Sequence, residues 1–317
     1  MDPDVPENNS SALPAFLFDR ILRARLPGEM SGNFQEQGPT DGSRRLAPPS
    51  VPGQAVEGPD ALDDHLVSLL APASFEAEQY RTLRYGLEQM AKAGQFTPIV
   101  GITSPTVGDG KTTTAINLAG ALGQAPEARV LLVDADLRRP CVGGQLGFGD
   151  SPAPGLADAI LDPGVSLDDV VRGCPPFNLS ILPAGRPPAA PYEVLKSPRL
   201  GELLEAARQR YDYILVDTPP VVPVPDCRLL AKWVDGFLVV VAAHKTPRPL
   251  VAEALTVLDP AKALGLVFNG DDRPFAGYYH AYGYAPDATR GGGRARAVRA
   301  VAAFLGRRRS TWQRGAP

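Results

Sequence analysis

Apolar runs alternate with helical patterns through the chain from about residue 61 onward. The runs are rich in Val, Ile and Leu, and several are nearly continuous, as parallel strands buried on both faces tend to be. They cover residues 98–104, 129–137, 178–185, 211–219, 235–243 and 264–270. The helical patterns between them cover residues 111–123, 197–211, 225–234 and 247–258. This alternation predicts an α/β fold with a doubly wound, mostly parallel sheet and right-handed crossovers.

The two ends of the chain lack this pattern. Residues 1–60 are rich in Pro, Gly, Ser, Asn and Asp, and only residues 15–26 could form a short amphipathic helix. Such a composition predicts a disordered N-terminal arm. After residue 275 a Tyr/Gly stretch leads into an Arg-rich tail. We therefore expect one domain over residues 61–275, followed by a separate C-terminal segment over residues 276–317.

Composition excludes several classes of protein. The net charge of −3 over 317 residues is not that of a nucleic-acid polycation, so no nucleic-acid partner is expected. Three scattered cysteines (Cys141, Cys174 and Cys227) are too few for a disulfide framework or a Cys-based zinc site. The N-terminus lacks the features of a secretory signal, and no stretch is long enough to span a bilayer. A cytoplasmic location is expected, with any membrane role exerted through a partner or an amphipathic surface.

A phosphate-binding loop follows the first predicted strand. The sequence TSPTVGDGKTTTAINLAGAL places a glycine loop and Gly-Lys-Thr between a strand and a helix, which is the context that a P-loop requires. The glycines let the backbone approach phosphate, and the helix directs its positive end at the anion. Lys111 can bridge the β- and γ-phosphates of ATP, and the Thr112 hydroxyl can ligate Mg²⁺. The predicted nucleotide-binding residues are Gly108, Asp109, Gly110, Lys111, Thr112 and Thr113.

Three acidic residues end two of the predicted strands. Asp134 and Asp136 close the run VLLVDAD, and Asp217 closes YILVD. In an open α/β sheet, ligands bind at the carboxyl ends of the strands, and side-chain alternation directs Asp134 and Asp136 the same way. Together with Lys111, these acids are the predicted catalytic residues. Asp217 suits a metal ligand beside Thr112, Asp134 suits metal binding or acceptor activation, and Asp136 could do either.

These motifs resemble those of the bacterial tyrosine kinases (BY-kinases) of capsule and exopolysaccharide systems, within the MinD/ParA-like superfamily of deviant Walker A P-loop NTPases. The phosphate loop resembles their Walker A, VLLVDADLRRP their Walker A′, and YDYILVDTPPV their Walker B. The resemblance runs from about residue 65 to 284. It implies ATP- and Mg²⁺-dependent autophosphorylation of tyrosine, in the form of the kinase that is separate from its membrane partner.

The resemblance also implies an assembly and a set of partners. The upstream segment EQYRTLR places Glu78, Arg81 and Arg84 on one helix face, and in the family this motif joins subunits into a ring. A solvated, salt-bridged helix face is the alternative explanation. A membrane-embedded chain-length regulator, which would recruit the protein to the membrane, and a cognate tyrosine phosphatase are the implied partners.

Four of the nine tyrosines lie in the segment YYHAYGY, at Tyr278, Tyr279, Tyr282 and Tyr284. Alone, such a cluster could be an exposed aromatic loop, an edge strand or a binding surface. With the resemblance, it is the predicted site of phosphorylation in trans between ring neighbours. The tail beyond it carries eight arginines against one acid, so it could bind anionic lipid or an acidic partner, or simply be a basic disordered tail.

Two other functions remain open at this point. A positioning ATPase without kinase activity would share the fold, but those proteins carry a lysine five residues before Lys111, where this chain has Thr106. A catalytically silent assembly partner would also keep the fold, although Lys111, Thr112, Asp134 and Asp217 are all present.

Overall fold

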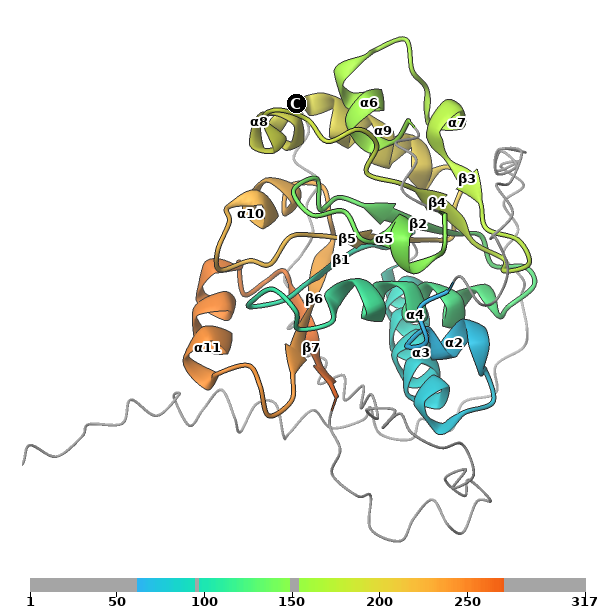
Figure 1. The fold of residues 1–317 in the computed structure, drawn as a ribbon, viewed down its shortest axis with the longest axis vertical. Coiled ribbons are helices and arrows are strands. Elements are labelled where there is room, and N and C mark those ends of the chain that lie inside the picture. Colours follow the sequence, from blue (N-terminus) through green and yellow to red (C-terminus); the bar gives the residue numbers. More distant parts are fainter. Residues whose placement is uncertain (1–61, 95–96, 149–153, 271–317) are drawn as a thin grey trace, which may run out of the picture.

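The computed structural model describes residues 62–94, 97–148 and 154–270, and within them it contains a seven-stranded sheet (Figure 1). The strand order is β3-β4-β2-β5-β1-β6-β7, and every neighbouring pair is parallel except β3 with β4. The strands are β1 Ile99–Thr103, β2 Val130–Asp134, β3 Arg172–Gly173, β4 Ser180–Leu182, β5 Tyr213–Asp217, β6 Gly236–Ala242 and β7 Ala263–Asn269. All six predicted strands are confirmed.

Helices cover both faces of this sheet, as a doubly wound fold requires. They are α2 Val67–Leu70, α3 Phe75–Gly94, α4 Lys111–Gly123, α5 Val142–Gln145, α6 Leu156–Leu161, α7 Leu167–Val170, α8 Pro191–Lys196, α9 Pro198–Arg208, α10 Asp226–Leu230 and α11 Arg248–Val257. Helices α2, α3 and α4 lie together on one side of the sheet, and α6, α8 and α9 lie on the other (Figure 1).

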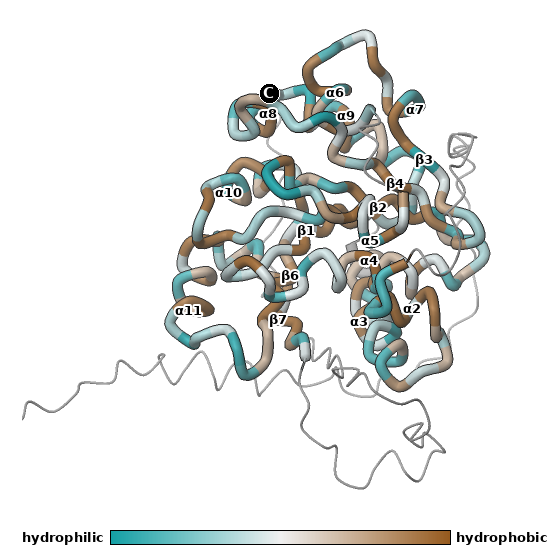
Figure 2. Tube along the Cα trace, viewed as in Figure 1, coloured by the Kyte–Doolittle hydropathy of each residue, from teal (hydrophilic) through white to brown (hydrophobic). Residues whose placement is uncertain are grey.

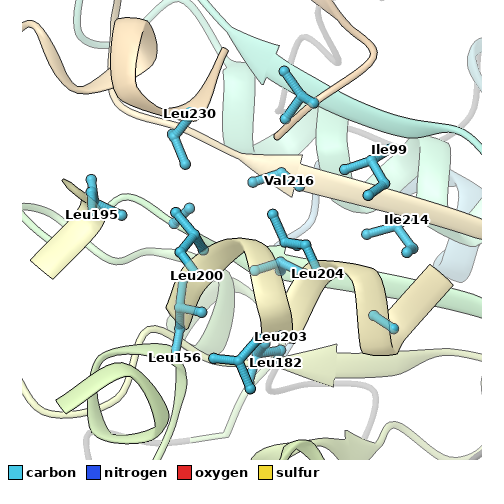
Figure 3. Close-up of a cluster of buried hydrophobic side chains, with 14 of the residues drawn as sticks. Ile99, Leu156, Leu182, Leu195, Leu200, Leu203, Leu204, Ile214, Val216 and Leu230 are labelled. Carbon is cyan, nitrogen blue, oxygen red and sulfur yellow. The ribbon is translucent and has the colours of Figure 1, made fainter. Parts of the chain in front are cut away.

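Alternate residues of each strand serve two separate cores. In β2, Leu131 and Val133 belong to the core that includes α9, whereas Val130 and Leu132 belong to the core that includes α3 and α4. Figure 3 shows part of the first core, where Ile214 and Val216 of β5 face leucines of α9. Figure 2 shows apolar segments both in the strands and in the helices that cover them. Burial on both faces is therefore the physical reason for the continuous apolar runs in the sequence.

The structure differs from the predicted element boundaries in several places. The predicted strand 178–185 is confined to β4, because the chain turns away through Pro183 and Gly185, where Gly155 packs closely against the backbone. The predicted helix 225–234 ends at Leu230. The short antiparallel β3 and the helices α2 and α5 to α8 were not predicted, since pieces of two to six residues carry too little periodicity to detect.

The predicted N-terminal arm, the tyrosine cluster and the basic tail lie outside the described residues. Within residues 62–94, 97–148 and 154–270, no helix is both long and apolar enough to cross a bilayer. Strands β1, β2 and β5 are parallel neighbours, so their carboxyl ends lie together at one edge of the sheet. The predicted site lies at this edge.

Candidate active site

The phosphate loop connects β1 to α4 and depends on two glycines. Gly108 and Gly110 have φ values of 82° and 90°, in the left-handed region that other residues rarely adopt. Gly110 is also the residue before α4, and a Cβ there would lie 1.8 Å from the amide nitrogen of Asn269. The helix consequently begins at Lys111, with its unpaired N-terminal N–H groups at the loop.

Asp109 directs its side chain into the protein rather than toward the surface of the loop. Its carboxylate accepts hydrogen bonds from the backbone N–H of Thr106 at 2.8 Å and from the hydroxyl of Thr246 at 2.8 Å. Asn269 donates to the carbonyl of Asp109 at 3.0 Å. Asp109 is only 1% exposed, so its side chain shapes the loop, and only its main chain remains to bind a phosphate.

A cluster of three side chains lies beside this loop and consists of Lys111, Thr112 and Asp217. The hydroxyl of Thr112 donates to Oδ2 of Asp217 at 2.7 Å. The Lys111 ammonium lies 2.9 Å from Oδ2 of Asp136 and 3.6 Å from Oδ1 of Asp217. The structure therefore brings together the predicted phosphate-binding lysine, the predicted metal-binding hydroxyl and two of the predicted acids. Thr113 donates instead to Gln145 of α5, at 3.2 Å.

Asp134 and Asp136 lie at the same sheet edge but bind different groups. Asp134 pairs in register with Asp217 across β2 and β5, and its carboxylate accepts from the backbone N–H groups of Cys141 at 3.2 Å and Val142 at 3.1 Å. Asp136 instead pairs with Lys111. The prediction that both carboxylates point the same way rested on strand alternation, and that rule does not apply because β2 ends at Asp134.

Burial controls the charges in this cluster. It raises the pKa of Asp134 to about 8, with the charge of Asp217 raising it further and the N–H of Val142 and Lys111 opposing. It also raises the pKa of Asp217 to about 6, against the lowering effects of Lys111 and Thr112. Burial alone would lower the pKa of Lys111, but the nearby charges of Asp217, Asp136 and Asp134 outweigh it, and this pKa is raised. Three buried acids thus share one lysine, which favours binding of a further cation.

The residues fit a magnesium ion that arrives with a nucleotide. Among the described residues, no three His, Cys, Asp or Glu side chains are grouped closely enough to hold a metal by themselves. However, Oδ1 of Asp217 is buried with no hydrogen-bond partner in the described part of the chain, beside the Thr112 hydroxyl. Mg²⁺ typically uses one or two carboxylates and completes its shell with phosphate oxygens and water.

Other residues that support the site were not identified from the sequence. Arg138 forms a two-bond fork with Asp226 at the start of α10, with its Nε at 2.7 Å from Oδ2 and its Nη2 at 3.0 Å from Oδ1. Asp226 is fully buried, so the fork fixes the loop after β2 against α10. Thr246 and Asn269 hold Asp109 from two further segments. No local spacing signals contacts between residues 88 to 160 positions apart.

The arginines of the ExxRxxR motif contact the other end of α4. Arg84 donates to the carbonyl of Ala121 at 2.9 Å and pairs with Glu88 at 2.6 Å. Arg81 pairs with Glu78, and it donates to the side chain of Gln124 at 3.2 Å and the carbonyl of Pro72 at 2.7 Å. Both arginines are therefore used within the chain, and their role between subunits stays a prediction.

The chain is similar to several known proteins in sequence and in fold. A model of an AAA domain matches residues 98–243. The tyrosine-protein kinase YwqD of Bacillus subtilis (strain 168) is 34% identical over 221 residues, which cover 69% of this chain and 91% of YwqD. The succinoglycan biosynthesis transport protein ExoP of Rhizobium meliloti is also 34% identical, and the matched region is 27% of its length.

A solved structure is similar as well. The kinase domain of the Escherichia coli tyrosine kinase ETK superimposes with a TM-score of 0.61 and 29% identity, over 67% of this chain and 83% of that domain. With the phosphate loop in its strand–loop–helix setting, the fold is that of a nucleotide-binding P-loop protein. Since the chain matches YwqD over nine-tenths of its length at this identity, it belongs to the family of bacterial tyrosine-protein kinases.

Proposed function

We propose that this protein transfers the γ-phosphoryl group of ATP to tyrosine and that its own Tyr278, Tyr279, Tyr282 and Tyr284 are the main acceptors. The observation that carries the proposal is the buried cluster of Lys111, Thr112 and Asp217 at the sheet edge, within 3.6 Å of one another. This arrangement of a lysine, a hydroxyl and a strand-end acid is the one that phosphoryl transfer from a P-loop requires.

Each residue has a distinct role in this mechanism. The backbone N–H groups of the loop and of the start of α4 hold the phosphates, and Lys111 moves its charge from Asp136 to the β- and γ-phosphate oxygens. Thr112 and Asp217 would hold Mg²⁺, with Asp134 close by across the strand pair. When bound, the ion neutralises charge on the phosphate oxygens.

The acceptor tyrosine must lose its proton as its oxygen bonds to the γ-phosphorus and ADP leaves. Asp134 is the better proton acceptor of the two Walker A′ acids, since burial raises its pKa and it forms no ion pair with Lys111. Asp136 would then serve to hold Lys111 in place before nucleotide binds.

The tyrosine segment comes shortly after the last strand that the structure describes, and that strand ends beside the phosphate loop. Strand β7 ends at Asn269, whose side chain bonds to Asp109 of the phosphate loop. Tyr278 comes eight residues after Gly270, and a chain of that length can span about 27 Å. A segment of this length can extend beyond its own subunit and enter the active site of a neighbour. Glu78, Arg81 and Arg84 are proposed to join such neighbours, with residues 61–275 as the kinase domain.

We further infer a role in exopolysaccharide or capsule production. ExoP, a longer relative, is named for succinoglycan biosynthesis and transport, and this chain corresponds to about a quarter of it. We propose that a membrane-embedded regulator is supplied here by a separate partner, which recruits and activates the kinase on the cytoplasmic side. A tyrosine phosphatase would reverse the modification.

The test is to incubate the full chain with ATP and Mg²⁺, with and without a membrane fragment of its activator, and to blot for phosphotyrosine. A signal that disappears in Lys111→Met and drops strongly when the four tyrosines are changed to Phe supports the proposal. ATP hydrolysis with no phosphotyrosine would instead favour a positioning ATPase. Neither hydrolysis nor phosphotyrosine, even with the fragment, would favour a silent assembly partner.

A further inference from the structure

The turn between β6 and α11, residues 243–247, contacts the phosphate loop through two consecutive side chains. The hydroxyl of Thr246 donates to Oδ1 of Asp109 at 2.8 Å, and the ammonium of Lys245 donates to the carbonyl of Gly108 at 3.2 Å. From the end of β7, the amide of Asn269 donates to the carbonyl of Asp109 at 3.0 Å. Two successive carbonyls of the loop are therefore held from outside by side chains more than 130 positions away.

Peptide geometry gives these contacts a consequence for anion binding. In a trans peptide, the C=O and the N–H of the same unit point in opposite directions. Holding the Gly108 carbonyl toward Lys245 therefore turns the N–H of Asp109 away from Lys245. Holding the Asp109 carbonyl toward Asn269 likewise turns the N–H of Gly110 away from Asn269. Successive N–H groups presented by a loop with left-handed residues form the concave anion sites known as nests.

The turn itself is rigidly built. His244 has a φ of 60°, a conformation uncommon for a residue other than glycine, and such strain persists only where the surroundings enforce it. The Thr246 hydroxyl accepts from the N–H of Ala242 at 3.0 Å, which leaves its single proton for Asp109. Pro247 follows at once and begins the path into α11. The turn therefore places both residues beside the loop, with Thr246 half-buried and the Lys245 side chain exposed.

The charges of Asp109 and Lys245 also indicate that these contacts shape the phosphate loop. Asp109 is a buried carboxylate beside a site for phosphate, and no basic side chain pairs with it within the residues that the structure describes. Hydrogen bonds alone hold it, so each contributes strongly to the shape of the loop. Lys245 has no acidic partner among residues 62–94, 97–148 and 154–270, and the Gly108 carbonyl is the acceptor for its ammonium.

We propose that Lys245, Thr246 and Asn269 are positioning residues for the nucleotide phosphates. They orient the peptides of Gly108 and Asp109 so that the N–H groups of Asp109 and Gly110 are directed at the phosphates before the nucleotide arrives. This inference rests on the proposed ATP binding, and it adds three residues to the site, none of which belongs to the Walker motifs. Their action is on affinity for phosphate rather than on the transfer step.

The experiment is direct titration of the full chain with Mg²⁺–ATP and, separately, with adenosine, by calorimetry. Thr246→Val keeps the shape of the side chain and removes its hydroxyl, and Lys245→Met removes the ammonium at similar length. Each is expected to weaken ATP binding about tenfold and to leave adenosine binding unchanged. The single variants Thr246→Ser and Lys245→Arg keep a hydrogen-bond donor and should bind ATP nearly as tightly as the wild type. The control Lys232→Met, at an exposed position, should leave ATP binding unchanged.

Further readouts separate orientation of the loop from other effects. In the kinase assay, KM for ATP should rise in Thr246→Val while kcat stays within about twofold, because a binding contribution equal in ground and transition states changes KM alone. Folding of each variant is checked by its thermal melt. Unchanged ATP affinity in folded Thr246→Val and Lys245→Met, with the wild type binding normally, would overturn this inference alone. A wild type that does not bind ATP would overturn the proposed function as well.

Discussion

The two ends of α4 hold charged side chains in opposite ways. At its N-terminal end, Lys111 is surrounded by Asp136 and Asp217, and one buried oxygen of Asp217 has no hydrogen-bond partner in the described residues. At its C-terminal end, Arg84 is bonded to both the Ala121 carbonyl and Glu88. Cations at a helix C-terminus stabilise it through the backbone carbonyls and the helix dipole. The first end is arranged to receive a ligand, and the second is already satisfied by the chain.

Activity and stability depend on different ends of α4. Burial raises the pKa values of Asp134 and Asp217, and acids perturbed in this way cluster at functional sites. The arginines at the other end contribute to the fold by conventional contacts. Substitutions at the two ends should therefore have opposite effects on stability.

The largest effect is expected from Asp217→Asn. Removing this carboxylate should lower the rate of phosphoryl transfer by about 100-fold or more, because Thr112 and Lys111 lose their shared partner and, under the proposed mechanism, Mg²⁺ would lose a ligand. The same change should leave the melting temperature unchanged or raise it, because it removes one of three crowded buried acids while Asp136 still pairs with Lys111. Autophosphorylation kinetics and calorimetry measure the two effects. A large drop in melting temperature would contradict the contrast between the two ends.

Arg138→Ala should have the next largest effect, this time on stability. It leaves the fully buried Asp226 without its two-bond partner, which we expect to cost about 2 kcal/mol in the free energy of unfolding. Denaturant unfolding provides the measurement, and the double variant Arg138→Ala with Asp226→Ala should recover part of the loss. If the double variant is less stable than the single one by the full cost of Asp226→Ala, the two side chains are not coupled.

Arg84→Ala tests the C-terminal end of α4. Loss of the hydrogen bond to Ala121 and of the positive charge at the helix end should lower the free energy of unfolding of the isolated subunit by about 1 kcal/mol. Unfolding is measured at a concentration where the wild type is monomeric, with Gln89→Ala, at an exposed position of α3, as a control. If the monomer is unaffected and only assembly is lost, Arg84 acts between subunits alone.

The smallest expected effect is on the pH dependence of stability and on the protons released when Mg²⁺–ATP binds. Folding raises the pKa of Asp134 to about 8 from a usual value of 3.8, so the folded state binds the extra proton between these limits. Stability contributed by this group is therefore present below about pH 4 and is lost as the pH rises toward 8. Binding of Mg²⁺–ATP favours the charged carboxylates and should release a fraction of a proton near pH 7.

Calorimetric titration in two buffers of different ionisation enthalpy measures that proton release. Asp134→Asn should reduce the release and should flatten the fall in melting temperature between pH 5 and pH 8. Proton uptake on binding, in place of release, would show that the carboxylates are already charged in the ligand-free protein.

Much of the fold could be predicted because its signals are local. Both faces of β1, β2, β5 and β6 are buried, and their sequences are therefore continuous apolar runs. The Gly-Lys-Thr sequence predicts the start of α4. The gathering of Lys111, Asp136 and Asp217 followed from the rule that ligands bind at the carboxyl ends of parallel strands. The different partners of Asp134 and Asp136 did not follow, because β2 ends between them.

Local sequence specifies the α/β class, the position of the phosphate loop and the three candidate acids, since periodicity and short motifs are properties of neighbouring residues. Packing of distant segments brings Arg84 to α4, Arg138 to Asp226, and Lys245, Thr246 and Asn269 to the phosphate loop. Those contacts join residues 37 to 160 positions apart. Their partners are set by how the helices and turns pack around the sheet, which no spacing along the chain encodes.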